Sequence, residues 1–340
     1  MSELRFDGQV AIVTGAGGQD PSLGRSHATL LAERGAKVVV NDLGVGPDGR
    51  GIMRANAEQV VEEILAAGGE AVPDLHSVAE EEDARKVVTT ALDTWGRLDI
   101  LVNNAGVCFM ARFDEISSAD IRNIIDVHLM GTVWMCRAAW PHMREAGYGR
   151  IVNTTSGAMF GIEKLSIYGA AKSGIFGLTR GLAVEGAELG IKVNALGPAA
   201  NTTAIRHFNE TSPFTELMEN HFPTKLVSPA VAYLSHRCCE LSGANLEAAA
   251  GNIGFRVFGQ TAGYTDTDLT AEKVRDNLST IADKNTATMI PDPGELPAGP
   301  TGAAQLGAVL KPYHPLEPLR AKSIREPLAR QTQLHDQETS

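Results

Sequence analysis

The length and composition describe a globular protein: 340 residues, 43% of them hydrophobic, are enough to bury a full core in one or two domains. No apolar run approaches the roughly 18 residues of a transmembrane helix, so we expect no membrane span. The formal net charge of −11 argues against a nucleic-acid partner, because a polyanion is normally met by clustered Lys and Arg.

The start of the chain and its cysteines indicate where the protein works. The N-terminal sequence passes into a strand without a cationic leader or cleavage site, which favours a soluble, unprocessed protein. The four cysteines lack metal-ligand spacing, and the adjacent pair is a poor disulfide candidate; they are Cys108, Cys136, Cys238 and Cys239. We therefore expect a cytoplasmic location and no metal site.

Apolar strand-like runs alternate with amphipathic helical stretches over the first 200 residues. The expected strands are 10–15, 36–42, 71–78, 98–106, 149–156 and 191–198. The expected helices are 22–34, 60–69, 81–96, 117–146 and 166–189, with Ser117 opening the longest one through a capping box. This alternation predicts an α/β protein with a Rossmann-type, doubly wound parallel sheet.

The pattern loosens after the last of these strands. Residues 200–236 are polar and aromatic, with three prolines and a short helix expected at 228–235. Ligands sit beyond the strand ends of a doubly wound sheet, so this segment is a candidate substrate lid, with an ordinary surface loop as the alternative. Residues 246–255 resemble a last strand and turn.

The domain organisation follows from these elements. Residues 1–256 are expected to form a single Rossmann-type domain, and 257–289 a helical extension whose helix at 270–284 is capped by Thr270. Residues 290–340 carry eight prolines and end in polar residues. Such a composition buries little, so we expect a disordered tail or an arm laid on a neighbouring subunit.

A glycine-rich loop after the first strand predicts a dinucleotide site. Glycines let the backbone approach a pyrophosphate, and the N-terminus of the following helix supplies unpaired N–H groups and a positive dipole end. The candidate contacts in this loop and at the helix start are Gly15, Gly17, Ser22, Leu23 and Gly24.

Asp42, at the end of the second strand, favours NAD as the cofactor. An acid at this position accepts hydrogen bonds from the adenosine ribose hydroxyls and repels a 2′-phosphate. Arg25 leaves NADP open, because a basic side chain beside the loop could reach a phosphate. After the fourth strand, Asn104, Ala105 and Gly106 are further candidate contacts, with Asn104 also able to brace the sheet.

Tyr168 and Lys172 carry the candidate chemistry. Positions i and i+4 share a helix face, so the phenol and the ammonium can act at one point. A free tyrosine titrates near pH ~10, and a close cation is expected to bring its pKa toward neutrality. Ser156, twelve residues earlier, is the expected donor to a substrate oxygen, with Thr155 as the alternative. These residues predict hydride transfer between a nicotinamide and an alcohol carbon.

These motifs, in the order TGAG, LGR, NNAG, Ser156, YGAAK and VNALGP, resemble the short-chain dehydrogenase/reductase superfamily. Further segments such as VVVNDLG, DVHLMG and LEAAAGNIG resemble the (3R)-hydroxyacyl-CoA dehydrogenase domains of peroxisomal D-bifunctional proteins, also called 17β-hydroxysteroid dehydrogenases type 4. The resemblance implies that Tyr168 is the acid/base, that Lys172 holds the nicotinamide ribose and lowers the tyrosine pKa, and that Ser156 steadies the substrate oxygen.

The resemblance adds further expected site residues and three departures. It places Val78, Pro198 and Thr202 against the cofactor, with His76 where the family has an acid. The glycine loop is longer than usual, so Ser22 stands in for a glycine and meets a phosphate. His128 replaces an asparagine that many members use in a proton relay, and a relay role and a structural role both stay open.

The substrate class is less constrained. The lid carries apolar side chains suited to a steroid or acyl chain: Phe208, Phe214, Leu217, Met218 and Phe222. Arg206, His207 and Lys225 are available for the phosphates of a CoA thioester. We expect a hydroxysteroid or a (3R)-3-hydroxyacyl-CoA as substrate, in a homodimer or homotetramer. The alternatives are an enoyl-thioester or 3-oxoacyl reductase and a non-catalytic dinucleotide-binding scaffold.

Overall fold

The computed structural model describes residues 3–44, 46, 55–203 and 213–295. It divides into two units, Met1–Arg256 and Val257–Ser340, which are described separately below. Residues 206–208 and the tail from 296 onward lie outside the described residues, so the expectations for Arg206, His207, Phe208 and the tail stay predictions.

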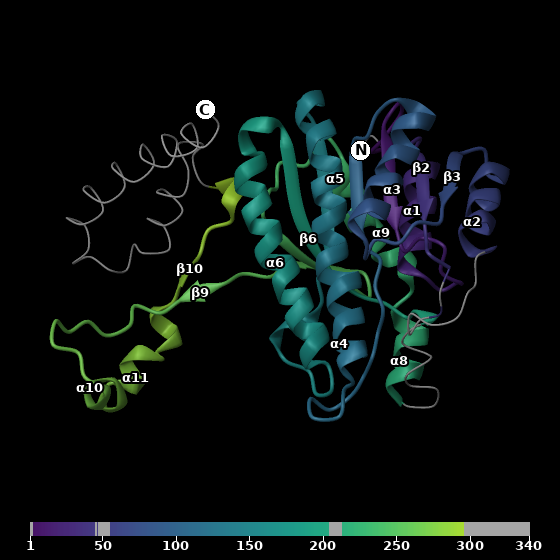
Figure 1. The fold of residues 1–340 in the computed structure, drawn as a ribbon. Helices are drawn as coiled ribbons and strands as arrows, with labels where there is room; N and C mark the ends of the chain where they lie inside the picture. The colour runs from purple at the N-terminus through teal and green to yellow at the C-terminus, as the bar shows by residue number, and fades with distance from the viewer. Residues whose placement is uncertain (1–2, 45, 47–54, 204–212, 296–340) are drawn as a thin grey trace, which may run out of the picture. The chain divides into compact units, whose positions relative to one another are not determined.

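An eight-stranded sheet runs through the first unit (Figure 1). Its strands, in spatial order, are β3 (Glu70–Asp74), β2 (Lys37–Asn41), β1 (Val10–Thr14), β4 (Ile100–Asn103), β5 (Gly149–Thr154), β6 (Ile191–Ala199), β7 (Asn245–Ala249) and β8 (Asn252–Phe255). β8 is antiparallel to β7, and every other pair in this sheet is parallel. The predicted Rossmann-type doubly wound sheet is confirmed. Its strand order reverses between β1 and β4, where such folds bind ligands beyond the carboxyl ends of the strands.

Helices cover both faces of this sheet because successive strand residues point to opposite sides. Val10 and Ile12 of β1 pack with helices α3 (Glu81–Trp95), α5 (Gly131–Ala146) and α6 (Ser166–Gly186). Ala11 and Val13 pack on the other face, with α1 (Leu23–Glu33), α2 (Ala55–Ala66) and α9 (Ser228–Ser235). In β4 the same alternation buries side chains in both clusters. The central strands β1 and β4 are therefore buried along their whole length, as expected for a sheet covered on both sides.

The helix predicted at 117–146 is present but interrupted. It begins with α4 (Ser118–Ile124), passes through a π-helical turn, η1 (Ile125–Met130), and continues as α5. The Ser117 hydroxyl accepts a hydrogen bond from the Asp120 amide at 3.1 Å, which is the predicted cap. The sequence did not predict this turn, because one extra residue in a helix produces no repeating pattern of apolar residues. Such turns are frequent at functional sites.

The helices α6 and α9 follow their predicted bounds closely, but the predicted last strand does not. α6 continues into a single 3₁₀ turn, η3 (Ala187–Leu189), and the short helix α9 spans its expected residues. The expected last strand and turn at 246–255 are instead a two-stranded hairpin, β7 and β8. Ala250 and Gly251 both have positive φ, at 48° and 80°, and this allows the tight reversal between the two strands.

The second unit has little regular structure. A two-stranded antiparallel pair, β9 (Gly259–Gln260) and β10 (Thr288–Met289), encloses the helices α10 (Ala271–Asp276) and α11 (Leu278–Ile281). Short 3₁₀ turns lie at η5 (Lys284–Thr286) and η6 (Pro293–Glu295). Thr270 caps α10 as expected, but the single helix expected at 270–284 is wrong. Asn277 ends α10, since its side-chain amide donates to the Lys273 carbonyl at 2.8 Å.

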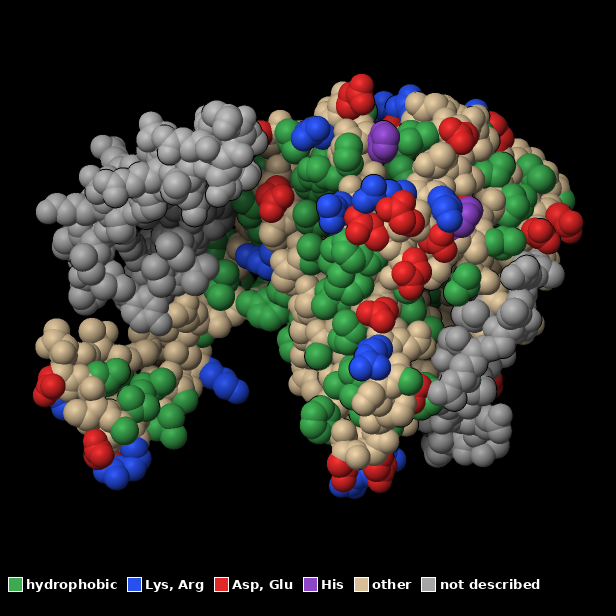
Figure 2. Space-filling view, in the orientation of Figure 1, with side chains coloured by type: hydrophobic (Ala, Val, Ile, Leu, Met, Phe, Trp, Pro, Cys, Tyr) green, Lys and Arg blue, Asp and Glu red, His purple; other side chains and the backbone are tan. Residues whose placement is uncertain are grey.

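For the residues that it describes, the structure bears on the expectations about membrane spans, cysteines and surface charge. None of the helices there has both the length and the apolar character that a bilayer crossing needs. The four cysteines are all described, and all are free thiols. On the face shown in Figure 2, acidic and basic side chains of the first unit are interspersed rather than gathered into one basic patch.

Leu101 tests how far the central sheet sets stability. It is fully buried in β4, so Leu101→Ala is expected to lower the free energy of unfolding by about 2–5 kcal/mol through lost burial and a cavity. Leu65→Ala, on the outer face of α2 where the side chain is 51% exposed, should change it by no more than about 0.5 kcal/mol. Urea unfolding of both variants measures the difference, and equal losses would contradict this assignment of the core.

Candidate active site

Tyr168 and Lys172 lie one turn apart on α6, as the spacing predicted. The Lys172 side chain is buried and its Nζ lies 5.6 Å from the centre of the Tyr168 ring. The same Nζ donates a hydrogen bond to the Thr154 carbonyl at 2.7 Å. Because Thr154 is the last residue of β5, this bond fixes α6 against the carboxyl end of that strand.

Ser156 follows β5 by two residues and begins the 3₁₀ turn η2 (Gly157–Phe160). Its Oγ accepts a hydrogen bond from the Ala158 amide at 3.2 Å, and the hydroxyl lies close enough to Tyr168 to act on the pKa of the phenol. The alternative donor, Thr155, is fully buried and donates to the Asn245 side-chain oxygen at 3.1 Å. The hydroxyl beside the tyrosine is therefore that of Ser156 rather than that of Thr155.

The pKa values differ from the sequence expectation. Burial raises the pKa of Tyr168 to about 12, and the neighbouring Ser156 hydroxyl offsets part of that rise. Burial lowers the pKa of Lys172 to about 7. The expected lowering of the tyrosine pKa by the ammonium is therefore absent in this chain on its own. The physical reason is that Nζ faces the ring and the Thr154 carbonyl while desolvation acts on both groups.

His128 lies in the π turn and packs its ring edge against Tyr168, with ring centres 5.0 Å apart and planes at 89°. Its Nε2 is 2.6 Å from the Val107 carbonyl, while Nδ1 has no hydrogen-bond partner among the described residues. Burial, helped by the charge of Lys172, lowers the pKa of His128 to about 3. The ring is thus neutral and supports the tyrosine ring from the side, and a relay role stays a hypothesis.

The glycine loop is held tightly against the start of α1 and the end of β4. A Cβ on Gly24 would lie 2.1 Å from the Gly15 carbonyl oxygen, so only glycine fits there. The Asn104 amide donates to the carbonyls of Thr14 and Gly15 at 3.0 and 3.1 Å. Asn104 therefore braces the loop, as expected of it, and Ala105 is held similarly through its amide and the Thr14 hydroxyl.

Asp42 follows β2 and faces the same loop. Its carboxylate accepts hydrogen bonds from the amides of Gly17 at 2.9 Å and Gly44 at 2.8 Å. Burial raises the pKa of Asp42, and these two amide bonds oppose the rise. The acid thus sits beside the glycine loop, where its remaining lone pairs suit ribose hydroxyls.

The start of α1 contains an N-cap serine and an arginine that is paired with a carboxylate. Ser22 is the N-cap residue, and its hydroxyl accepts from the Arg25 amide at 3.5 Å. No acidic side chain lies in the first turn of α1, so the positive end of the helix, beginning at Leu23, is not neutralised by its own residues. The Arg25 guanidinium pairs with Glu63 of α2, and this occupies the side chain that left NADP open.

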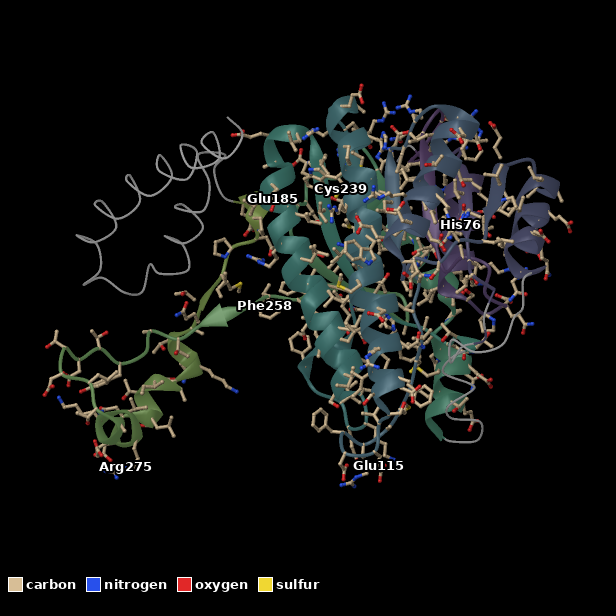
Figure 3. The ribbon with its side chains drawn as sticks, viewed as in Figure 1. His76, Glu115, Glu185, Cys239, Phe258 and Arg275 are labelled. Carbon is tan, nitrogen blue, oxygen red and sulfur yellow. The ribbon has the colours of Figure 1, made fainter. Side chains whose placement is uncertain are left out.

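The remaining expected cofactor residues are spread around this edge of the sheet. Val78 is buried against Gly131, and a Cβ on Gly106 would lie 2.3 Å from His128 Cε1, so Gly106 makes room for that ring. Pro198 is the second-last residue of β6, and Thr202 follows the end of this strand by three residues. His76, labelled in Figure 3, instead contacts Asp74 at 3.1 Å.

The lid is only partly described. Its helix α8 (Pro213–His221) buries Met218 and leaves Leu217 49% exposed. The side chain of Phe214 lies outside the described residues, and Lys225 is exposed. The Phe222 carbonyl accepts a hydrogen bond from the Asn201 amide at 2.7 Å, which ties the end of the lid to the segment after β6.

Two residues that position the site were missed. Thr14 accepts the amides of both Asn104 and Ala105 at 3.0 Å through its hydroxyl, and the TG pair after the first strand was the available signal. Thr203 donates to the Gln19 carbonyl at 3.0 Å, linking the lid entrance to the glycine loop. Contacts between residues 184 positions apart leave no pattern in a single sequence.

The doubly wound sheet, the glycine loop and the neighbouring Tyr168 and Lys172 on α6 are the features that place this chain in a family. The family model described as short chain dehydrogenase matches residues 9–212, and the chain belongs to this family. The resemblance stated from the sequence motifs is confirmed.

Similar proteins refine this placement. The chain is 42% identical over 292 residues to the mouse peroxisomal multifunctional enzyme type 2; the match covers 84% of this chain and 38% of the mouse enzyme, so the chain spans well under half of that relative. A short chain dehydrogenase crystal structure from Mycobacterium avium superimposes with a TM-score of 0.69 at 35% identity, over 84% of this chain and 97% of that one. A structure of 7α-hydroxysteroid dehydrogenase complexed with NADH and 7-oxo glycochenodeoxycholic acid superimposes with a TM-score of 0.65 at 28% identity. The match covers 74% of this chain and 98% of that one.

The two fully buried histidines, His27 and His128, predict a pH-dependent stability. Burial lowers the pKa of each to about 3, whereas an unfolded histidine titrates near ~6.5. Below pH ~6.5 the unfolded chain binds the extra protons, so stability is full above that pH and falls toward pH ~3 by up to about 1.4 kcal/mol per pH unit for each histidine. His27→Gln should reduce this slope in urea unfolding between pH 7 and 5. His221→Gln, at an exposed position, should not, and identical slopes in all three proteins would refute the assignment.

Proposed function

We propose that this chain is an NAD-dependent dehydrogenase that interconverts a secondary alcohol and a ketone on a bulky apolar substrate. The observation that carries the proposal is the Ser156 hydroxyl beside Tyr168, with the Lys172 ammonium one helical turn further on. Two neighbouring hydroxyls can both reach one substrate oxygen.

The roles of the side chains follow from their positions. In the oxidative direction Tyr168, as the tyrosinate, takes the hydroxyl proton of the substrate, and Ser156 donates a hydrogen bond to the same oxygen. Lys172, one helical turn from the phenol, holds the ribose next to the reacting carbon. His128 keeps the phenol ring in place through its edge contact. The bound nicotinamide supplies the hydride acceptor.

The residues present fit a dinucleotide. The N-terminus of α1 offers unneutralised N–H groups for a pyrophosphate, and the loop that precedes it is kept narrow by Gly15 and Gly24. Asp42 offers acceptors for ribose hydroxyls. We propose NAD rather than NADP, because Asp42 would repel a 2′-phosphate and the nearby Arg25 is already paired with Glu63.

The substrate class is proposed from the relatives and the lid. The 7α-hydroxysteroid dehydrogenase structure is a complex with 7-oxo glycochenodeoxycholic acid, which supports a hydroxysteroid substrate. The resemblance of the sequence motifs to (3R)-hydroxyacyl-CoA dehydrogenase domains supports a (3R)-3-hydroxyacyl-CoA as the second candidate. Leu217 exposes an apolar surface on the lid helix beside the buried Met218. The cytoplasmic location and the dimer or tetramer stay predictions, and the name of the mouse relative points to peroxisomes as the competing location.

A panel assay tests the proposal. Purified protein is mixed with NAD or NADP and with hydroxysteroids or (3R)-3-hydroxyacyl-CoA thioesters, and formation of NADH or NADPH is followed by absorbance. Turnover with one class identifies the substrate. Binding of NAD without turnover on any secondary alcohol would instead support the non-catalytic scaffold.

Tyr168→Phe tests the acid/base role. The variant keeps the ring that packs on His128 but loses the proton-transferring hydroxyl, so we expect turnover to fall by roughly 10³-fold with an unchanged dissociation constant for NAD. Tyr233→Phe, at a position 38% exposed on α9, is the matched control and should keep its activity. Turnover within a few-fold of normal in Tyr168→Phe would remove the assignment.

Asp42→Asn tests the cofactor preference. The amide keeps an acceptor for the Gly17 amide but removes the negative charge, so the ratio of kcat/KM with NAD to that with NADP should fall by about 10-fold or more, equivalent to about 1.4 kcal/mol. Asp20→Asn, exposed in the same loop, should leave the ratio unchanged. An unaltered ratio in the Asp42 variant would show that this carboxylate does not select the cofactor.

A further inference from the structure

Arg256, directly after β8, is a buried cation close to the turn that begins at Ser156. Its side chain is only 10% exposed, and it is held by Glu247 of the neighbouring strand β7. Nη2 donates to one carboxylate oxygen of Glu247 at 2.5 Å and Nε to the other at 3.3 Å. A two-point pair of this kind fixes the plane of the guanidinium as well as its position.

The other side of this guanidinium contacts the turn η2. Its central carbon lies 5.3 Å from the centre of the Phe160 ring, at the end of the turn. At the start of the turn, a Cβ on Gly157 would lie 3.4 Å from Nη2. The guanidinium therefore touches both ends of the four residues that Ser156 caps.

The surroundings leave the guanidinium little freedom. A Cβ on Gly197 of β6 would lie 3.0 Å from Nη1, so the absence of a side chain there makes room for this group. Nη1 is buried and has no hydrogen-bond partner among the described residues. A buried donor without a partner costs about 1–3 kcal/mol, so the contacts with Glu247 and the turn must offset that cost to keep the arginine here.

We propose that Arg256 is a positioning residue for Ser156: clamped by Glu247, it supports the turn η2 and so sets the Ser156 hydroxyl at the distance from Tyr168 that the reaction needs. The kinetic part of this inference rests on the proposed dehydrogenase function. Misplacement of a reacting group by about 1 Å is enough to reduce turnover roughly 100-fold. A lysine in place of Arg256 keeps the charge but cannot form the planar two-point pair or stack on Phe160 in the same way.

A double-mutant cycle tests the kinetic part. Arg256→Lys is expected to lower kcat by about 10-fold or more when Ser156 is present, and by less than about 2-fold in the Ser156→Ala background, with NAD binding unchanged in both. Arg97→Lys is the matched control, since Arg97 holds Asp99 by two similar bonds, at 2.8 and 2.6 Å, just before β4 begins. Equal losses with and without Ser156, or no loss at all, would overturn the proposal.

A second measurement does not depend on activity. Amide hydrogen exchange of Ala158, whose N–H donates to Ser156 Oγ, should be faster in Arg256→Lys than in the parent protein and unchanged in Arg97→Lys. Unchanged exchange in a folded Arg256 variant would refute the positioning role. If the parent protein turns over no alcohol but the exchange result holds, the proposed function fails while the support of this turn by Arg256 stands.

Discussion

The site depends first on one buried hydrogen bond, from the Lys172 ammonium to the Thr154 carbonyl. It joins the middle of α6 to the end of a central strand, two residues before Ser156. Because Tyr168 is on the same helix face as Lys172, this bond also sets where the phenol stands relative to the serine. Burying an ammonium is costly unless it is hydrogen-bonded, and the fall of the Lys172 pKa to about 7 reflects that cost. Burial therefore destabilises the charged form of Lys172, while its hydrogen bond fixes the position of α6.

A second set of bonds organises the opposite side of the same edge. The Asn104 side chain connects the end of β4 to the loop after β1. The Thr14 hydroxyl accepts hydrogen bonds from the backbone amides of Asn104 and Ala105. The two strands flank the reversal in strand order, where the crevice of such a sheet opens. Small residues are required here for packing as much as for a ligand, since Gly24 and Gly106 make room for protein atoms. Packing and cofactor contact thus place the same demand on these positions.

The sequence revealed local features and missed those that arise from distant contacts. Strand positions, the caps at Ser117 and Thr270 and the tyrosine–lysine spacing were readable because each depends on a few adjacent residues. The π turn and the antiparallel β8 were not, because one extra residue in a helix and the direction of an edge strand leave no periodic trace. The prediction of a lowered tyrosine pKa was wrong because it considered the charge of Lys172 but not the burial of Tyr168, which raises the pKa. The cofactor and catalytic roles stay predictions, although the residues assigned to the catalytic roles do meet in space.

The π-helical turn at Ile125–Met130 has a consequence for how this chain tolerates changes in length. One surplus residue is stored there, so deleting one residue inside the turn would give ordinary α-helix and leave the phase of α5 unchanged. Met135 and Cys136 of α5 would then still face the sheet. The same deletion would take His128 off the side of the tyrosine ring. A second deletion would find no surplus residue to absorb it, and it would rotate α5 by about 100° about its axis and turn Met135 and Cys136 away from the sheet.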